Sequence, residues 1–207
     1  MNNTFDARAK EWDKPDRIKM AEVVTRCIMA GVGFTKEMSG VDFGAGTGLV
    51  TLEIAKKVRH MTAIDSSEGM LEVLKDKIRA GGIDNVSTMV LDIEKDPVGL
   101  KGLDFIASSM AIHHVEDTAK MASVFYGMLK PDGMAALADL EKEDGSFHNS
   151  GNSAGVKHNG FDRAALSSVF QKVGFKNARF TTAYNVERRN EKGESRSYPI
   201  FLLLAEK

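Results

Sequence analysis

Glycines alternate with other residues in one short stretch of the chain, Asp42-Phe-Gly-Ala-Gly-Thr-Gly48. Glycine lets the backbone approach a ligand closely, because no side chain intervenes. Apolar residues at helical spacing follow at once, so we expect free N–H groups of the loop at a helix N-terminus, where they can hold polar or anionic groups. Asp65 ends the next apolar stretch, where a carboxylate can accept both hydroxyls of a ribose. The two pieces together predict a nucleotide-type pocket.

The spacing of these glycines limits which nucleotide can bind. A dinucleotide fingerprint, Gly-x-Gly-x-x-Gly, would require glycine at position 49 or 51, where the chain has Leu49 and Thr51. A phosphate-binding P-loop would end in Gly-Lys-Ser or Gly-Lys-Thr, whereas this loop continues into Leu49 and Val50. The loop therefore disfavours both types of site.

Histidines are the candidate general bases, because an unperturbed imidazole pKa near ~6.5 suits proton removal at neutral pH. His113 and His114 follow an expected strand, at the carboxyl edge where open α/β sheets bind their ligands. His158 lies in a polar loop and is a candidate substrate contact. For His113 and His114, a structural histidine bonded to the backbone is the competing interpretation.

The polar loop over 141–160 also contains His148 close to several carboxylates, a composition that sometimes binds a metal ion. The spacing of these residues matches no known ligand pattern. We therefore expect no metal site, and we interpret the loop as a substrate lid with solvated charges.

Strand and helix signals alternate along the chain, as in a doubly wound α/β sheet. Helical patterns cover 16–31, 48–58, 67–80, 117–129 and 162–172, and strand-like runs cover 39–43, 60–64, 86–91, 103–109, 134–139, 175–185 and 197–205. Helical crossovers between the earlier strands predict parallel pairing, whereas the last two strands, joined by a charged tip over 188–196, predict an antiparallel hairpin. We expect one domain of 207 residues.

Three motifs resemble those of a known family. The Asp-x-Gly-x-Gly-x-Gly loop between a strand and a helix, followed by Asp65, resembles motif I of the class I S-adenosylmethionine-dependent methyltransferases. The runs Ser108-Ser-Met-Ala-Ile-His-His-Val-Glu-Asp117 and Met128-Leu-Lys-Pro-Asp-Gly133 resemble the small-molecule branch typified by ubiquinone and menaquinone C-methyltransferases, which usually has Pro-Gly-Gly in the second run. The resemblance implies a Rossmann-like, doubly wound, seven-stranded sheet, mostly parallel with an antiparallel C-terminal hairpin strand.

The resemblance also implies S-adenosyl-L-methionine as the cofactor and S-adenosyl-L-homocysteine as its product. In that family the glycine loop holds the methionine part, the acidic residue after the second strand holds the ribose, and the end of the third strand faces the adenine. The wall after the fourth strand completes the pocket. The implied cofactor-binding positions are Asp42, which braces the loop, and Gly44, Ala45, Gly46, Gly48, Asp65, Ser66, Met70, Asp92, Ile93, Ser109 and Met110.

The segment before the first strand resembles the lid of the same branch. Phe5 and Trp12 would cover the cofactor, and for Phe5 plain packing on the core is an equal alternative. We therefore expect three regions within the domain: a helical lid over 1–38, a cofactor-binding half over 39–140, and a substrate side over 141–207.

Composition limits the partners and the location of the protein. The formal net charge is −1, and two short basic clusters, 56–59 and 188–189, predict solvated edges rather than a nucleic-acid partner. The single cysteine, Cys27, fits a reducing compartment. No apolar window is long enough to span a bilayer, and the first residues lack signal-peptide character, so we expect a cytoplasmic protein without membrane insertion.

These observations predict an enzyme that moves a methyl group to a small-molecule acceptor by in-line displacement. One alternative is a nicotinamide-dependent oxidoreductase on a related sheet, which the glycine spacing disfavours. The other is a non-catalytic S-adenosylmethionine-binding protein. Methylation of amide or base nitrogens would call for an Asn-Pro-Pro-aromatic run after the fourth strand, where Ser108-Ser-Met-Ala111 stands instead. The acceptor atom and the oligomeric state stay open.

Overall fold

The computed structural model describes residues 5–148, 155–189 and 195–207. Within these ranges seven strands form one sheet in the order β3-β2-β1-β4-β5-β7-β6. The strands are β1 (Ser39–Phe43), β2 (His60–Asp65), β3 (Val86–Val90), β4 (Leu103–Ser109), β5 (Leu129–Leu140), β6 (Lys176–Arg189) and β7 (Ser195–Glu206). β7 runs antiparallel to both β5 and β6, and the other neighbouring pairs are parallel. The predicted mostly parallel sheet with an antiparallel C-terminal strand is confirmed.

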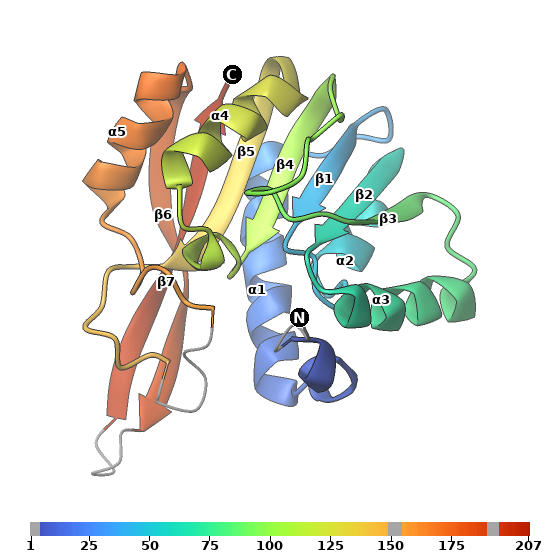
Figure 1. The fold of residues 1–207 in the computed structure, drawn as a ribbon, viewed down its shortest axis with the longest axis horizontal. Helices are drawn as coiled ribbons and strands as arrows, with labels where there is room; N and C mark the ends of the chain where they lie inside the picture. Colours follow the sequence, from blue (N-terminus) through green and yellow to red (C-terminus); the bar gives the residue numbers. More distant parts are fainter. Residues whose placement is uncertain (1–4, 149–154, 190–194) are drawn as a thin grey trace.

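Helices cover both faces of the sheet (Figure 1). α4 (Thr118–Met128) and α5 (Arg163–Val173) pack on one face, and α1 (Pro15–Val32) and α2 (Thr51–Ala55) pack on the other. α3 (Glu68–Gly81) packs on β2 and β3 and also contacts the N-terminal 3₁₀ helix η1 (Asp6–Glu11). A second short 3₁₀ helix, η2 (Ile112–His114), follows β4.

The central strands are buried on both faces, which explains their continuous apolar sequences. Along β7, Phe201 and Leu203 belong to the core under α4 and α5, whereas Leu202 and Leu204 belong to the core under α1 and α2. This alternation follows from the two-residue period of a strand. Because the strands are packed on both faces, the positions of their carboxyl ends are fixed.

Polar caps set where the helices begin. The side chains of Ser67, Asp117 and Asp162 accept hydrogen bonds from backbone N–H groups in the first turns of α3, α4 and α5. Asp162 is also the first residue of the predicted helical pattern over 162–172, and it caps α5. The predicted start of a helix at residue 48 is wrong, because Gly48 has a φ of +84°, and α2 begins only at Thr51.

The strand boundaries in the C-terminal part differ from the prediction. β5 begins at Leu129 rather than 134, and its first residue pairs with Leu103 of β4. β6 continues to Arg189, so part of the predicted charged tip is strand, and positions 190–194 lie outside the described residues. Of the loop over 141–160, the described parts form a single bridge, between Glu141 and Phe161.

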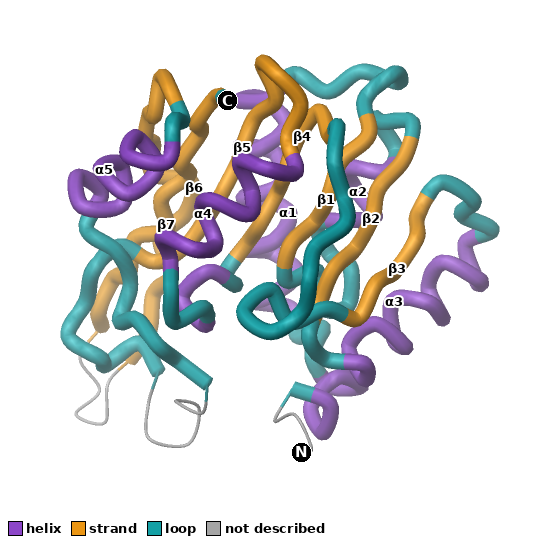
Figure 2. The backbone as a smooth tube through the Cα atoms, turned by 45° about the horizontal axis from the view of Figure 1, so that its top comes forward, coloured by secondary structure: helices purple, strands orange, loops and turns teal. Residues whose placement is uncertain are grey.

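The carboxyl ends of β1, β2 and β4 lie at the edge of the sheet where the N-terminal segment folds over, as Figure 2 shows from a second direction. No helix in the described ranges is long and apolar enough to cross a membrane.

Candidate functional site

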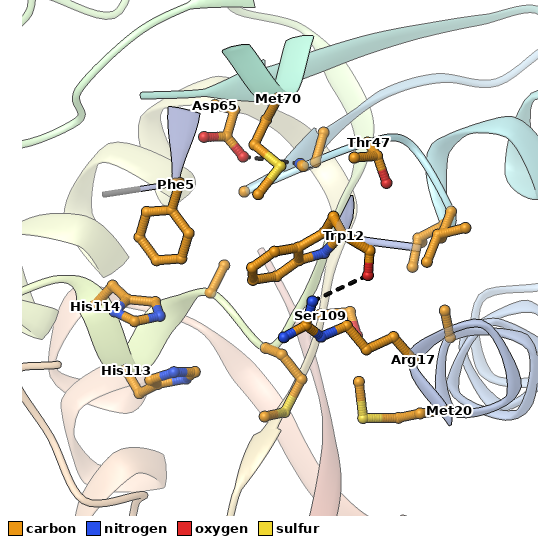
Figure 3. Close-up of a pocket in the computed structure, with 18 of the residues that line it drawn as sticks. Phe5, Trp12, Arg17, Met20, Thr47, Asp65, Met70, Ser109, His113 and His114 are labelled. Atoms are coloured by element: carbon orange, nitrogen blue, oxygen red, sulfur yellow. Dashed lines mark hydrogen bonds between the residues drawn. The ribbon is translucent and has the colours of Figure 1, made fainter. Parts of the chain in front are cut away.

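A cavity of about 660 Å³ lies at the carboxyl ends of β1, β2 and β4. This size is typical of pockets for small organic ligands. The strand order reverses between β1 and β4, and open α/β sheets bind their ligands at such a switch point. The walls come from the N-terminal segment, the loops that follow β1 to β4, the segment around residue 147, and β6 (Figure 3). The cavity therefore joins the predicted cofactor-binding half to the C-terminal hairpin.

The glycine loop is closed onto the end of β2. Gly44 N and Ala45 N donate to the Ile64 carbonyl at 2.8 and 2.9 Å, and Gly46 N donates to the Asp65 carboxylate at 2.8 Å. The expectation of free N–H groups at these positions is therefore wrong, because the end of β2 supplies acceptors for them. The loop is instead a rigid backbone surface beside the cavity.

The three glycines of the loop have different roles. All have positive φ, +70° at Gly44, +54° at Gly46 and +84° at Gly48. A Cβ on Gly44 would lie 2.2 Å from Ala111, and a Cβ on Gly48 would lie 2.2 Å from Leu74, so packing requires glycine at both positions. A Cβ on Gly46 would meet no atom closer than 4.0 Å. Gly46 therefore lies open to the cavity, whereas Gly48 supports the loop from behind and does not line it.

Asp65 is held by backbone N–H groups on both sides. One carboxylate oxygen accepts from Gly46 N and the other from Ser67 N, each at 2.8 Å. Burial raises the pKa of Asp65, while these N–H donors favour the ionised form. A carboxylate has about four acceptor sites, so about two remain for ligand hydroxyls. Ser66 and Met70 line the cavity beside Asp65, so the structure brings these predicted residues together.

Asp42 lies under the loop and is almost fully buried. Its carboxylate accepts a hydrogen bond of 2.6 Å from the Thr51 hydroxyl, which ties the end of β1 to the first turn of α2. Burial raises the pKa of Asp42 to about 7. The contact of Asp42 with α2 is the kind of bracing that the sequence analysis expects of it.

The segment after β3 forms the wall beside Asp65. Leu91 and Ile93 are buried and present apolar surface to the cavity. The Asp92 carboxylate accepts from Glu94 N at 3.0 Å and from the Lys95 ammonium at 2.5 Å. Asp92 therefore lines the cavity, as expected, but it already has two hydrogen-bond donors.

The wall after β4 contains Ser109 and Met110, which both line the cavity. Met110 has a φ of +56°, a conformation that is uncommon for a residue with a side chain. Its N–H donates to the Ala138 carbonyl at 2.8 Å, so pairing with β5 holds this conformation in place. Backbone strain of this kind is concentrated at functional sites.

His113 lies across the cavity from Asp65 (Figure 3) and belongs to a buried histidine–aspartate pair. His113 Nδ1 lies 2.7 Å from an oxygen of Asp139, the penultimate residue of β5, and both side chains are almost fully buried. A carboxylate can only accept, so Nδ1 of a neutral His113 carries the proton and Nε2 carries the lone pair. Nε2 is buried and has no hydrogen-bond partner among the described residues. The pair therefore orients the His113 ring, which borders the cavity while its Nε2 is shielded from solvent.

Two more imidazoles lie beside this pair. The ring centroids of His114 and His148 are 4.1 and 5.1 Å from that of His113. Burial, followed by repulsion from His113, lowers the pKa of both side chains to about 4, so both are neutral at neutral pH. His114 also donates from Nδ1 to the Gly155 carbonyl at 2.8 Å. In the part of the chain that the structure describes, no group of three His, Cys, Asp or Glu residues is placed to hold a metal ion.

The structure does not bring His158 into the cavity wall. Its Nε2 lies 2.9 Å from the Val115 carbonyl, and its ring packs against Phe161 at 5.1 Å between centroids. The backbone N–H of His158 donates to the His113 carbonyl at 3.1 Å. His158 therefore holds its loop against η2 and does not take the place of the substrate contact that the sequence analysis expects.

Comparisons with known proteins agree with this geometry. Residues 41–133 match the family model described as a methyltransferase domain. An uncharacterized methyltransferase of Schizosaccharomyces pombe is 28% identical over 154 residues, which are 68% of this chain and 54% of that protein. A demethylmenaquinone methyltransferase of Staphylococcus aureus is 28% identical over 148 residues, 69% of this chain and 61% of that protein. These matches confirm the predicted resemblance to the class I S-adenosylmethionine-dependent methyltransferases.

A solved structure shows the same methyltransferase fold. Phosphoethanolamine N-methyltransferase 2 of Haemonchus contortus, in complex with S-adenosyl-L-methionine, has a TM-score of 0.74 at 15% identity. The match covers 99% of this chain and 60% of that chain. The matched residues make up 54% of the Schizosaccharomyces pombe protein and 61% of the Staphylococcus aureus protein. This chain therefore spans less than two thirds of the length of either relative.

The N-terminal segment of this methyltransferase fold is fastened to the rim of the cavity by two carboxylates. Asp13 accepts from the Thr47 hydroxyl and from the Lys77 ammonium, each at 2.5 Å. Asp6 accepts from Gly69 N at 2.9 Å, at the start of α3. These contacts connect the segment to the glycine loop and to α3.

Aromatic rings of the same segment lie across the cavity (Figure 3). Phe5 packs edge-on against Trp12 at 5.8 Å between centroids and against His114 at 5.2 Å. Phe5 therefore contacts the cavity wall rather than only the core. Together with the two carboxylates, these rings form a cover over the opening.

Sequence reasoning missed several residues of the cavity. The predicted solvated edge at 188–189 is wrong for Arg188, whose half-buried side chain lines the cavity. A signal existed, because the two-residue period of β6 puts Arg188 on the same face as Tyr184 and Val186, which pack on the core. Arg17 and Phe147 also line the cavity, and no local pattern marks them.

The first prediction concerns the protonation of Asp42. In the unfolded chain this carboxyl titrates near 3.8, and in the folded protein near 7, so only the folded state keeps the proton between these values. The stability that this proton gives is present below the lower pKa and is lost as the pH rises to about 7. Asp42→Asn cannot titrate, and we expect its unfolding free energy to lose this pH dependence, worth at most ~4 kcal/mol.

Urea unfolding of both proteins at several pH values between about 4 and 7 measures the difference. Asp76→Asn, an exposed position on α3, serves as the control and should keep the wild-type slope. Equal slopes for wild type and Asp42→Asn would contradict the assignment.

The second prediction concerns the cover. Asp13→Asn removes the charge that holds Lys77, so we expect the cover to open more often, with a loss of about 1–3 kcal/mol in its closed state. Trp12 is the single tryptophan of the chain and reports the opening directly through acrylamide quenching of its fluorescence. Glu72→Gln breaks an exposed pair with Lys75 on the same helix and should leave the quenching unchanged. Equal quenching in all three proteins would show that the Asp13 contact does not hold the cover.

Proposed function

We propose that this chain is an S-adenosylmethionine-dependent methyltransferase that acts on a small-molecule acceptor. The observation that carries the proposal is the glycine loop bonded to Asp65 at the switch point of the sheet. The demethylmenaquinone methyltransferase among the relatives supports a small-molecule acceptor, and the fold neighbour in complex with S-adenosyl-L-methionine supports this cofactor. When bound, this cofactor supplies an electrophilic methyl group on a positively charged sulfur.

The residues of the cavity fit this cofactor. Asp65 keeps acceptor sites for two ribose hydroxyls, and Leu91 and Ile93 offer apolar surface to a flat base. Gly46 offers backbone without a side chain to the amino-acid part of the ligand. Trp12 lies 4.0 Å from the position of a Cβ on Gly46, so its ring covers this end of the cavity and excludes water.

His113 is the proposed general base for an acceptor that must lose a proton. Its Nδ1–H is bonded to Asp139, which fixes the ring and leaves the Nε2 lone pair for the acceptor. A positioned base of this kind contributes about 10²–10⁴-fold to a rate, and alignment of donor and acceptor in a dry cavity contributes more. His114 and His148 are neutral walls beside it rather than competing bases, because burial keeps their pKa values low.

Two alternative functions fit less well. A nicotinamide-dependent oxidoreductase would need the third glycine of a dinucleotide fingerprint, and Leu49 or Thr51 stands at that position. A non-catalytic cofactor-binding protein would have no use for the buried pair of His113 and Asp139. An unpartnered buried Nε2 lowers the stability of the fold by about 1–3 kcal/mol. A role in accepting a proton would explain why the chain has this nitrogen there.

The proposed function is tested first by calorimetric titration with S-adenosyl-L-homocysteine. Asp65→Ala removes the ribose contact and loosens the glycine loop, and we expect binding about 10- to 100-fold weaker than in wild type. Asp76→Ala, at an exposed position on α3, is the control and should bind as wild type does. Folded wild-type protein that does not bind the ligand would contradict the proposed function.

The proposed base is tested through its tautomer. Nitrogen-15 NMR of histidine-labelled protein should show His113 protonated at Nδ1 and not at Nε2 at neutral pH, because the Asp139 carboxylate accepts from Nδ1. Asp139→Asn removes this acceptor charge and should mix the two tautomers, whereas Asp132→Asn, in an exposed part of β5, should not. A wild-type His113 protonated at Nε2 would rule out its role as a base from that nitrogen.

A further inference from the structure

Two half-buried arginines, Arg17 and Arg188, line the cavity together with the acidic residues Asp16 and Glu187. The guanidinium of Arg188, on β6, lies 3.9 Å from the centre of the Phe147 ring and donates to the Phe147 carbonyl. The guanidinium of Arg17, on α1, lies 3.9 Å from the centre of the Trp12 ring and donates to the Trp12 carbonyl at 3.0 Å. Neither forms a salt bridge with an acidic side chain within 5–148, 155–189 or 195–207.

The nearby carboxylates do not neutralise this wall. Asp13 is bonded to Thr47 and Lys77. Asp16 attracts both Arg17 and Arg188 but forms no ion pair with either in the described structure. Burial is the main cause that lowers the pKa of both arginines. A half-buried cation that lacks full hydration is stabilised by an opposite charge, so this wall favours an anionic ligand.

The two arginines are close enough that repulsion from Arg188 contributes to the lowered pKa of Arg17, but they stack on different rings. Arg17 stacks on Trp12, which faces the glycine loop, so Arg17 belongs to the cofactor end. Arg188 stacks on Phe147, whose ring centroid is 4.8 Å from that of His148, and His148 in turn is 5.1 Å from His113. Arg188 is therefore connected through two rings to the proposed base rather than to the glycine loop.

We propose that Arg188, held by Phe147, binds an anionic group of the methyl acceptor, a carboxylate or a phosphate, and thereby places the reacting atom near His113. The proposal rests on the proposed function and adds the chemical class of the acceptor to it. A guanidinium presents a planar fork of N–H donors that matches two oxygens of such a group. Stacking on Phe147 and the bond to its carbonyl fix the fork before the ligand arrives, so less side-chain entropy is lost on binding.

The experiment compares two probes of the same shape, benzoate and benzamide, on the full chain in the presence of S-adenosyl-L-homocysteine. Ligand-observed NMR detects weak binding of both. We expect wild type to bind benzoate at least about tenfold more tightly than benzamide, the effect of one charge-assisted hydrogen bond. Arg188→Gln should lose this preference while its affinity for S-adenosyl-L-homocysteine, measured by calorimetry, stays unchanged. Arg188→Lys keeps the charge without the fork and should keep part of the preference.

Arg196→Gln is the matched control. Arg196 pairs with Arg188 in the register of β6 and β7, but its exposed side chain binds Asp144 outside the cavity. It should keep the wild-type preference, and thermal melting of each variant confirms that all are folded. Equal binding of benzoate and benzamide to wild type, or a preference that survives Arg188→Gln, would overturn the proposal.

The same samples separate the two possible sources of an anionic group, the acceptor and the carboxylate of the cofactor. If Arg188→Gln weakens S-adenosyl-L-homocysteine as much as Arg17→Gln does, then Arg188 serves the cofactor and the proposal is wrong. Absence of S-adenosyl-L-homocysteine binding to wild type would instead refute the proposed function. Normal binding of S-adenosyl-L-homocysteine without a benzoate preference refutes the Arg188 proposal alone.

Discussion

The hydrogen bond from Gly46 N to the Asp65 carboxylate joins the ends of β1 and β2, and the rest of the candidate site depends on it. It fixes the loop in a left-handed conformation at Gly46 and orients the carboxylate toward the cavity. The carboxylate is buried, which raises its pKa, and the N–H donors around it offset part of that cost. A ligand that binds here meets a preformed surface, so little order has to be created on binding.

The other end of the cavity depends on contacts between distant parts of the chain. His113 follows β4, its partner Asp139 lies in β5, and Arg188 comes from β6. The neighbouring strands β4, β5 and β7 hold these positions in register, and β6 is paired outside β7. The Asp139 carboxyl group, 2.7 Å from Nδ1, is the side chain that orients the His113 ring. The sheet thus positions a base that local sequence alone does not orient.

The contrast between local contacts around Asp65 and long-range contacts around His113 explains how much of the site could be predicted from the sequence. The glycine loop, Asp65 and the cap at Asp162 follow from local order, and all three are found where local rules place them. The parallel pairing of the earlier strands follows from the alternation of helices and strands, since helical crossovers join parallel strands. Local rules failed at the start of α2, because the periodicity of a helix does not show that Gly48 takes a positive φ.

Long-range pairs were beyond such rules. Nothing within several residues of Asp139 marks it as the partner of His113, which lies 26 positions earlier. The partner of Arg188, the Phe147 ring, is 41 positions earlier. A pair of neighbouring arginines is usually solvated, and only the extension of β6 to Arg189 turns one of them inward. Tertiary structure therefore decides the chemistry of the acceptor end.

One charge of the cavity suits the proposed reaction. The guanidinium of Arg188 stacks on Phe147, which packs against His148 beside the proposed base. Removal of a proton from an acceptor that already carries an anionic group adds a second negative charge close to His113. The neutral His114 and His148 cannot balance that charge, whereas a fixed guanidinium can. The cation that selects the acceptor would therefore also stabilise its deprotonated form, which links recognition to reactivity at this end of the cavity.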